Sequence, residues 1–279
     1  MEPRPAVAGV RLIIGAGQSN MSGRGDLPDH HPLLEPHPHI WQFGATHAAL
    51  VPATVPLDMH DDASGLSPLT VLAHHYAADH PQDLVLLVPA AHGGTGFSTS
   101  SAQVLPEGFH RGNPGGGSWQ LDHHEPTNLA TAMLRQVRAA RTAAYERWHV
   151  AVSPTAFVWH QGEADTQSRA TTYPALFRAL VEKVRDEVAA PSMPVLIGGM
   201  VPEWVAADPI RSRVQEHLSS LPESIPHAAF VPGPTGCHRD GDLVHYGWEG
   251  ARELGARYYR ALTDLTGDSA PAGRLRAER

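Results

Sequence analysis

Five short apolar runs, separated by segments of helical periodicity, restrict this chain to an α/β fold. They are residues 10–14, 83–89, 155–159, 195–200 and 228–231. The run at 83–89 is continuously apolar, as expected of a parallel strand that is buried on both faces. Strands that alternate with helices favour one parallel sheet with helices on both sides. We therefore predict an α/β fold around a five-stranded parallel sheet.

The segments between these runs carry helix signals. Ser67 and Pro68 form a cap and a first helical position ahead of apolar residues at helical spacing. Residues 40–43 alternate like a short strand, whereas residues 26–38 and 50–59 are predicted to be loops. Residues 98–124 are irregular and rich in glycine and serine, which fits either a substrate-facing loop or a plain surface excursion. Further helices are predicted at residues 128–148, 176–184, 209–218 and 248–265.

The chain shows no internal repeat and no linker with a change of composition. At 279 residues it is long enough to bury a substantial core. We expect a single domain over residues 1–266 and a frayed tail over residues 267–279.

Composition excludes several classes of partner. The formal net charge of −8 argues against a nucleic-acid surface, which needs clustered Lys and Arg. No apolar stretch approaches the length of a membrane span, so no membrane partner is expected. The single cysteine, Cys237, rules out an internal disulfide. The N-terminal segment has no apolar run before a small-residue cleavage site, which predicts a cytoplasmic protein; a secreted chain trimmed of its leader would look the same. The sequence does not indicate the oligomeric state.

A glycine-rich turn follows the first apolar run and presents Ser19. Residues 15–25 read GAGQSNMSGRG and come directly after the predicted strand at 10–14. Ligands of open α/β sheets bind beyond the carboxyl ends of the strands. Ser19 is therefore a candidate nucleophile, and the alternative is that it only caps a helix.

Three other turns supply the remaining groups that acyl transfer needs. His245 is the candidate base, because an imidazole can accept the serine proton and return it to a leaving alcohol. Asp242 lies three residues earlier, close enough to orient that imidazole. The N–H groups of Ser19 and Gly94 and the side-chain amide of Gln161 are the candidate oxyanion donors.

Four motifs in this order resemble the conserved blocks of the SGNH hydrolase superfamily. The chain is similar to its sialate O-acetylesterase and acetylxylan esterase branch, carbohydrate esterase family 6, over about residues 10–265. The motifs are residues 17–23 (GQSNMSG), 93–95 (GGT), 159–165 (WHQGEAD) and 242–245 (DLVH).

The resemblance implies a three-layer α/β/α sandwich with flavodoxin-like strand order. It implies Ser19 as the nucleophile, His245 as the base and no metal. The oxyanion hole would include Gln161, where relatives commonly have asparagine. In this branch Glu163 competes with Asp242 as the group that orients His245, and we favour Asp242 because of its spacing.

Residues beside these motifs are candidates for substrate contact or metal binding. The 19 histidines include three adjacent pairs, but no zinc-protease spacing occurs, and no metal or other cofactor is predicted. The candidate substrate-binding residues are Gln18, Asn20, Arg24, His92, Gly93 and His160.

Together these features predict a serine esterase that removes small O-acyl groups, most readily acetyl, from a carbohydrate or similar polyol. One alternative is an acyltransferase or tailoring esterase that acts on a secondary metabolite with the same residues. The other is a catalytically silent sugar-binding module.

Overall fold

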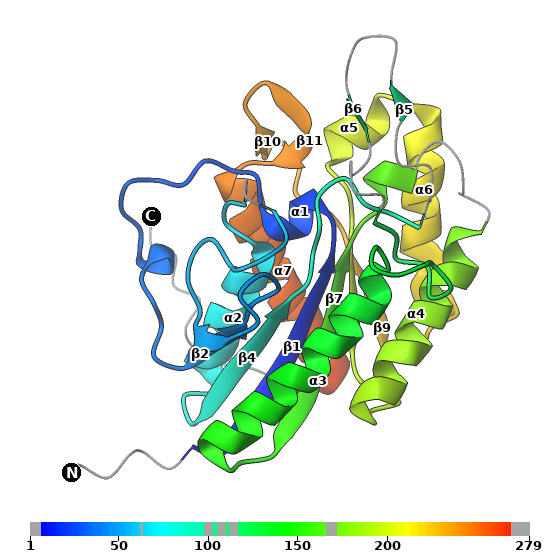
Figure 1. The fold of residues 1–279 in the computed structure, drawn as a ribbon. Helices are drawn as coiled ribbons and strands as arrows, with labels where there is room; N and C mark the ends of the chain where they lie inside the picture. Colours follow the sequence, from blue (N-terminus) through cyan, green and yellow to red (C-terminus); the bar gives the residue numbers. More distant parts are fainter. Residues whose placement is uncertain are drawn as a thin grey trace.

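A mostly parallel sheet of seven strands forms the centre of the molecule (Figure 1), in the order β3-β2-β4-β1-β7-β8-β9. The computed structural model describes residues 7–61, 64–97, 103–104, 110–111, 117–165 and 172–268. Neighbouring strands pair in parallel except β3, which is antiparallel to β2. The strands are β1 (Gly9–Gly17), β2 (Ile40–Phe43), β3 (Leu50–Pro52), β4 (Asp83–Pro89), β7 (Val152–His160), β8 (Val195–Gly198) and β9 (Ala228–Val231).

The prediction of five strands is wrong, because the sheet continues beyond β4 with β2 and β3. The five predicted runs form β4-β1-β7-β8-β9, which is the strand order 2-1-3-4-5 of flavodoxin-like sheets. Strand β2 has only four residues, and β3 has three and ends at Pro52. A proline is tolerated on an edge strand such as β3. In a strand of three residues, however, it removes the alternating pattern by which a strand is predicted.

Helices cover both faces of the sheet (Figure 1). On one face α2 and α7 pack against each other, and on the other α3 lies against β1, β4 and β7 with α4 beside it. The helices of eight or more residues are α2 (Pro68–Asp79), α3 (Leu129–Trp148), α4 (Tyr173–Val188), α6 (Pro209–Ser220) and α7 (Trp248–Thr266). Shorter helical segments are α1 (Ser19–Ser22), η1 (Pro32–Leu34), η2 (Glu163–Asp165), α5 (Pro202–Ala206) and η3 (Leu221–Glu223).

The predicted start of α2 agrees with the structure. Pro68 is its first residue, and the Ser67 hydroxyl accepts a hydrogen bond from the Leu69 N–H at 3.1 Å. Within the sheet, all seven residues of β4 are buried, as their continuous apolar pattern predicts.

One continuous apolar core includes residues of the sheet and of α2, α3, α4, α6 and α7. We propose on this basis that residues 1–266 form one domain. Most of the loop at 98–124 and the tail beyond Asp268 lie outside the described residues. No helix in the described part of the chain is long and apolar enough to span a membrane.

Two small antiparallel pairs lie outside the main sheet. One joins β10 (His238–Arg239) to β11 (Asp242–Tyr246), and the other joins β5 (Gln103–Val104) to β6 (His110–Arg111). The β10–β11 pair contains both Asp242 and His245 and lies near α1 (Figure 1). Residues that are far apart in the sequence therefore meet where β1 ends.

Candidate active site

Ser19 is the first residue of α1, directly after the turn that ends β1. Gly17 has a φ of 124°, and a Cβ atom there would lie 2.1 Å from the carbonyl oxygen of His160. Only glycine fits such a close approach between two strand ends. The Gln18 N–H donates to that same carbonyl oxygen at 2.9 Å. The turn therefore holds Ser19 at the carboxyl ends of β1 and β7.

Ser19, His245 and Asp242 form a continuous line of close polar contacts. His245 Nε2 lies 2.9 Å from Ser19 Oγ, and its Nδ1 lies 2.6 Å from Asp242 Oδ2. Ser19 is only 4 % exposed, whereas the His245 and Asp242 side chains are partly open to solvent. The structure thus brings together the predicted nucleophile, base and orienting acid.

Asp242 is held in its ionised form. Partial burial by itself would raise the pKa of this carboxyl, but the hydrogen bond with His245 and a 2.9 Å bond from the Val244 N–H outweigh it. The pKa of Asp242 is therefore below its ordinary value. A carboxylate at Nδ1 keeps a proton on that nitrogen and leaves Nε2 free to accept the proton of Ser19.

Glu163, the alternative candidate for orienting His245, contacts Asn20 and His160. Its Oε1 accepts from Asn20 Nδ2 at 2.6 Å and lies 3.6 Å from His160 Nε2. The Glu163 side chain is buried, with 4 % of the residue exposed. Because Asp242 already occupies the Nδ1 side of His245, the geometry favours Asp242 over Glu163 as the orienting group.

The side-chain amide of Gln161 is committed inside the protein. Its Nε2 faces Asp165 Oδ2 at 2.9 Å and the Thr95 carbonyl and Gln18 Oε1 at 3.2 Å each. Its Oε1 accepts from the Tyr173 hydroxyl at 2.8 Å, and the residue is fully buried. The two hydrogens of Gln161 Nε2 already face three acceptors, so neither is available to an oxyanion. This geometry disfavours Gln161 as an oxyanion donor.

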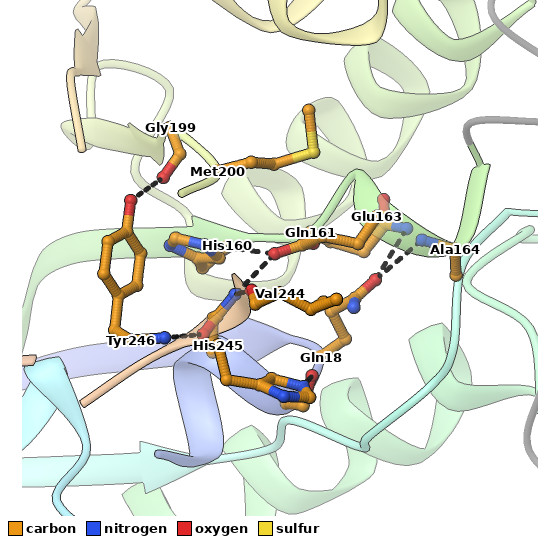
Figure 2. A network of polar contacts seen from close by, with 12 residues as sticks. Gln18, His160, Gln161, Glu163, Ala164, Gly199, Met200, Val244, His245 and Tyr246 are labelled. Atoms are coloured by element: carbon orange, nitrogen blue, oxygen red, sulfur yellow. Dashed lines mark hydrogen bonds and ion pairs between the residues drawn. The ribbon is translucent and has the colours of Figure 1, made fainter. Parts of the chain in front are cut away.

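Gln18 offers the donor that Gln161 lacks (Figure 2). Its Oε1 accepts from the Ala164 N–H and from Gln161 Nε2, both at 3.2 Å. A backbone N–H can only donate, so the oxygen must face Ala164 and the amide nitrogen must point the other way. That nitrogen has no hydrogen-bond partner among the described residues and is not fully buried. This amide nitrogen, Gln18 Nε2, is on the residue immediately before Ser19, so it is a candidate donor to the oxyanion.

Asp61 connects the turn at residues 93–95 to the loop that follows Ser19. Its Oδ2 accepts from the Gly93 N–H at 2.7 Å, from Arg24 Nη2 at 2.8 Å and from the Ser22 hydroxyl at 2.9 Å. Burial would raise the pKa of Asp61, but the Arg24 guanidinium and the hydrogen bonds from Ser22 and Gly93 together outweigh it and lower this pKa. The Gly93 N–H is thus occupied, while no described residue accepts from the N–H of Gly94.

The other predicted substrate contacts are mostly internal. Asn20 and His160 are buried, and His160 Nδ1 lies 2.9 Å from the Tyr258 hydroxyl. Arg24 is paired with Asp61 and is 13 % exposed, and His92 stacks on His60 at 5.2 Å between ring centroids. Asn20 and His160 are therefore enclosed by the protein in this structure.

Sequence reasoning missed Asp61, because a lone acid in a segment without periodicity gives no signal.

The described residues also contain no group of three or more His, Cys, Asp or Glu that could hold a metal ion.

An α/β sheet with serine, histidine and aspartate in contact near its strand ends is the arrangement of a serine hydrolase. A family model described as carbohydrate esterase, sialic acid-specific acetylesterase, matches residues 9–264. The chain belongs to this family of carbohydrate esterases and is a carboxylic ester hydrolase that acts on O-acetyl groups of carbohydrates.

Solved structures with low sequence identity share the fold. A protein from Arabidopsis thaliana has a TM-score of 0.69 at 21 % identity, over 91 % of this chain and 98 % of that one. NanS has a TM-score of 0.69 at 17 % identity, over 93 % and 98 %. A carbohydrate acetylesterase from Xanthomonas citri has a TM-score of 0.60 at 16 % identity, over 92 % and 57 %. No curated protein matches the chain in sequence.

Proposed function

We propose that the chain removes O-acetyl groups from a carbohydrate or similar polyol through an acyl-enzyme on Ser19. The observation that carries this proposal is the line of contacts from Ser19 Oγ to His245 Nε2 and from His245 Nδ1 to Asp242, at 2.9 and 2.6 Å. Membership of the esterase family supports the acetylated carbohydrate as substrate.

In the first half of the reaction, His245 takes the proton of Ser19 as the hydroxyl oxygen attacks the ester carbonyl. Asp242 stabilises the imidazolium that forms. The negative charge on the carbonyl oxygen needs preorganised donors. We assign this role to the N–H groups of Ser19 and Gly94 and to Gln18 Nε2, which replaces Gln161 in the predicted set.

In the second half, the tetrahedral intermediate collapses and His245 gives its proton to the departing sugar hydroxyl. The acetyl group remains on Ser19. His245 then removes a proton from water as the water oxygen attacks the acetyl-enzyme, and the second intermediate collapses to release acetate while His245 returns the proton to Ser19 Oγ. Apart from the substrate and water, these steps use only groups of the protein itself.

The acyl preference of the enzyme tests this function. We expect acetyl esters of p-nitrophenol to be hydrolysed with a kcat/KM at least about tenfold above that of the octanoyl ester, since pockets discriminate by acyl length. O-acetylated sugars should release free acetate. A preference for octanoate would contradict the acetylesterase assignment.

Transfer of acetyl to an added sugar in place of hydrolysis would support the acyltransferase alternative. Absence of any turnover would support the sugar-binding module.

A further inference from the structure

The strand that carries His245 is not part of the main sheet. Strand β11 pairs with β10 in a separate two-stranded sheet. The distance between His245 and Ser19 therefore depends on contacts that join β11 to the rest of the protein. One of these is the hydrogen bond from the Tyr246 hydroxyl to the Gly199 carbonyl at 2.9 Å (Figure 2).

A second connection comes from the side chain of Asn20. Its Nδ2 donates to the Val244 carbonyl at 3.0 Å, and its Oδ1 accepts from the Tyr246 N–H at 3.0 Å. Val244 and Tyr246 are the neighbours of His245 on either side, and Asn20 itself follows Ser19. One amide thus links the backbone of the nucleophile to the backbone on both sides of the base.

Glu163 fixes the orientation of that amide. The other hydrogen of Asn20 Nδ2 donates to Glu163 Oε1 at 2.6 Å. Burial alone would raise the pKa of Glu163, but the neighbouring His160 imidazole, 3.6 Å away, and the hydrogen bond from Asn20 outweigh it and keep its pKa below the ordinary value. An ionised carboxylate only accepts hydrogen bonds, so the nitrogen of Asn20 must face Glu163 and its oxygen must face Tyr246.

We propose that Asn20, oriented by Glu163, is a positioning residue that sets the distance between His245 and Ser19; this rests on the proposed function. Asn20 is 2 % exposed, and its amide nitrogen and oxygen both have partners inside the protein. It therefore acts through His245 and not through contact with the substrate.

The test is the variant Asn20→Asp, which keeps the size of the side chain but loses both donors and places a second carboxylate against Glu163. We expect kcat to fall by about 100-fold with KM within about twofold, because small misplacements of reacting groups cost this much. The rate of inactivation by phenylmethylsulfonyl fluoride should fall in parallel, since it depends on the same serine and histidine. If Asn20→Asp does not fold, Asn20→Ser, which adds no charge, is expected to show the same loss of kcat.

Rescue separates positioning from a general structural effect. In Asn20→Asp combined with Glu163→Gln, the new amide can donate to the carboxylate introduced at position 20, so part of the lost kcat should return. Glu163→Gln alone still offers an acceptor to Asn20 and should lower kcat by less than about tenfold.

Asn128 provides a matched control. It is equally buried, and its Nδ2 donates to the carbonyls of Leu121 and His123 while its Oδ1 accepts from the Thr131 N–H. Asn128→Asp should lower the melting temperature but leave kcat near that of the wild type. The proposal is overturned if folded Asn20→Asp or Asn20→Ser keeps kcat within about threefold of wild type, or loses no more than Asn128→Asp. An inactive wild type would instead refute the proposed function itself.

Discussion

Replacement of Asp242 by asparagine is expected to lower kcat by about 10⁴-fold with little change in KM, the size of effect known for the corresponding change in serine proteases. The asparagine amide would donate to His245 Nδ1, which now lies 2.6 Å from Asp242 Oδ2. His245 would then carry its proton on Nε2 and could not accept the proton of Ser19. Steady-state kinetics on p-nitrophenyl acetate would measure both parameters, and circular dichroism would confirm that the variant folds.

The matched variant is Glu163→Gln, which neutralises the competing carboxylate. Because Glu163 contacts Asn20 and His160, its neutralisation should cost far less than the neutralisation of Asp242. If instead Glu163→Gln lost 10⁴-fold and Asp242→Asn kept most of its activity, Glu163 would be the group that orients His245.

Removal of the amide of Gln18 is expected to lower kcat by roughly 10²- to 10³-fold, the effect of losing one oxyanion donor. Gln18→Glu is the sharper variant, because its carboxylate can still accept from the Ala164 N–H but has no donor for the oxyanion. Its negative charge would also oppose the charge that develops on the substrate. We therefore expect Gln18→Glu to lose at least as much kcat as Gln18→Ala.

Gln161 supports Gln18 through the 3.2 Å contact between Nε2 and Oε1, so Gln161→Ala should also lower kcat, but by less than Gln18→Ala. A normal kcat in Gln18→Ala together with a 10²- to 10³-fold loss in Gln161→Ala would contradict this assignment and restore the role predicted from the sequence.

The central sheet was predictable because buried parallel strands leave a plain pattern. The apolar run of β4 and the Ser67–Pro68 start of α2 depend on local sequence, and both agree with the structure. Residues 40–43 were predicted as a short strand but not counted in the sheet, because a four-residue run does not reveal its pairing with β4. The edge strand β3 was predicted as a loop, because it has three partly or fully exposed residues and its pairing is decided by the neighbouring strand.

The site was predictable where its chemistry depends on short spacing. Asp242 and His245 lie three residues apart, and their contact follows from that local geometry. The orientation of the Gln161 side chain could not be predicted in this way. It depends on hydrogen bonds with Tyr173 and Asp165, which form only in the folded chain. Asp61 likewise became visible only when the fold placed it beside Gly93.

In the proposed reaction the acetyl group passes through Ser19. The most direct test of this step is mass spectrometry of enzyme quenched in acid during turnover of p-nitrophenyl acetate. We predict an acetylated peptide that contains Ser19 in the wild type. In Ser19→Ala we expect neither that adduct nor hydrolysis above about 10⁻⁴ of the wild-type rate. Acetylation at another residue, or substantial turnover by Ser19→Ala, would contradict an acetyl-enzyme on Ser19.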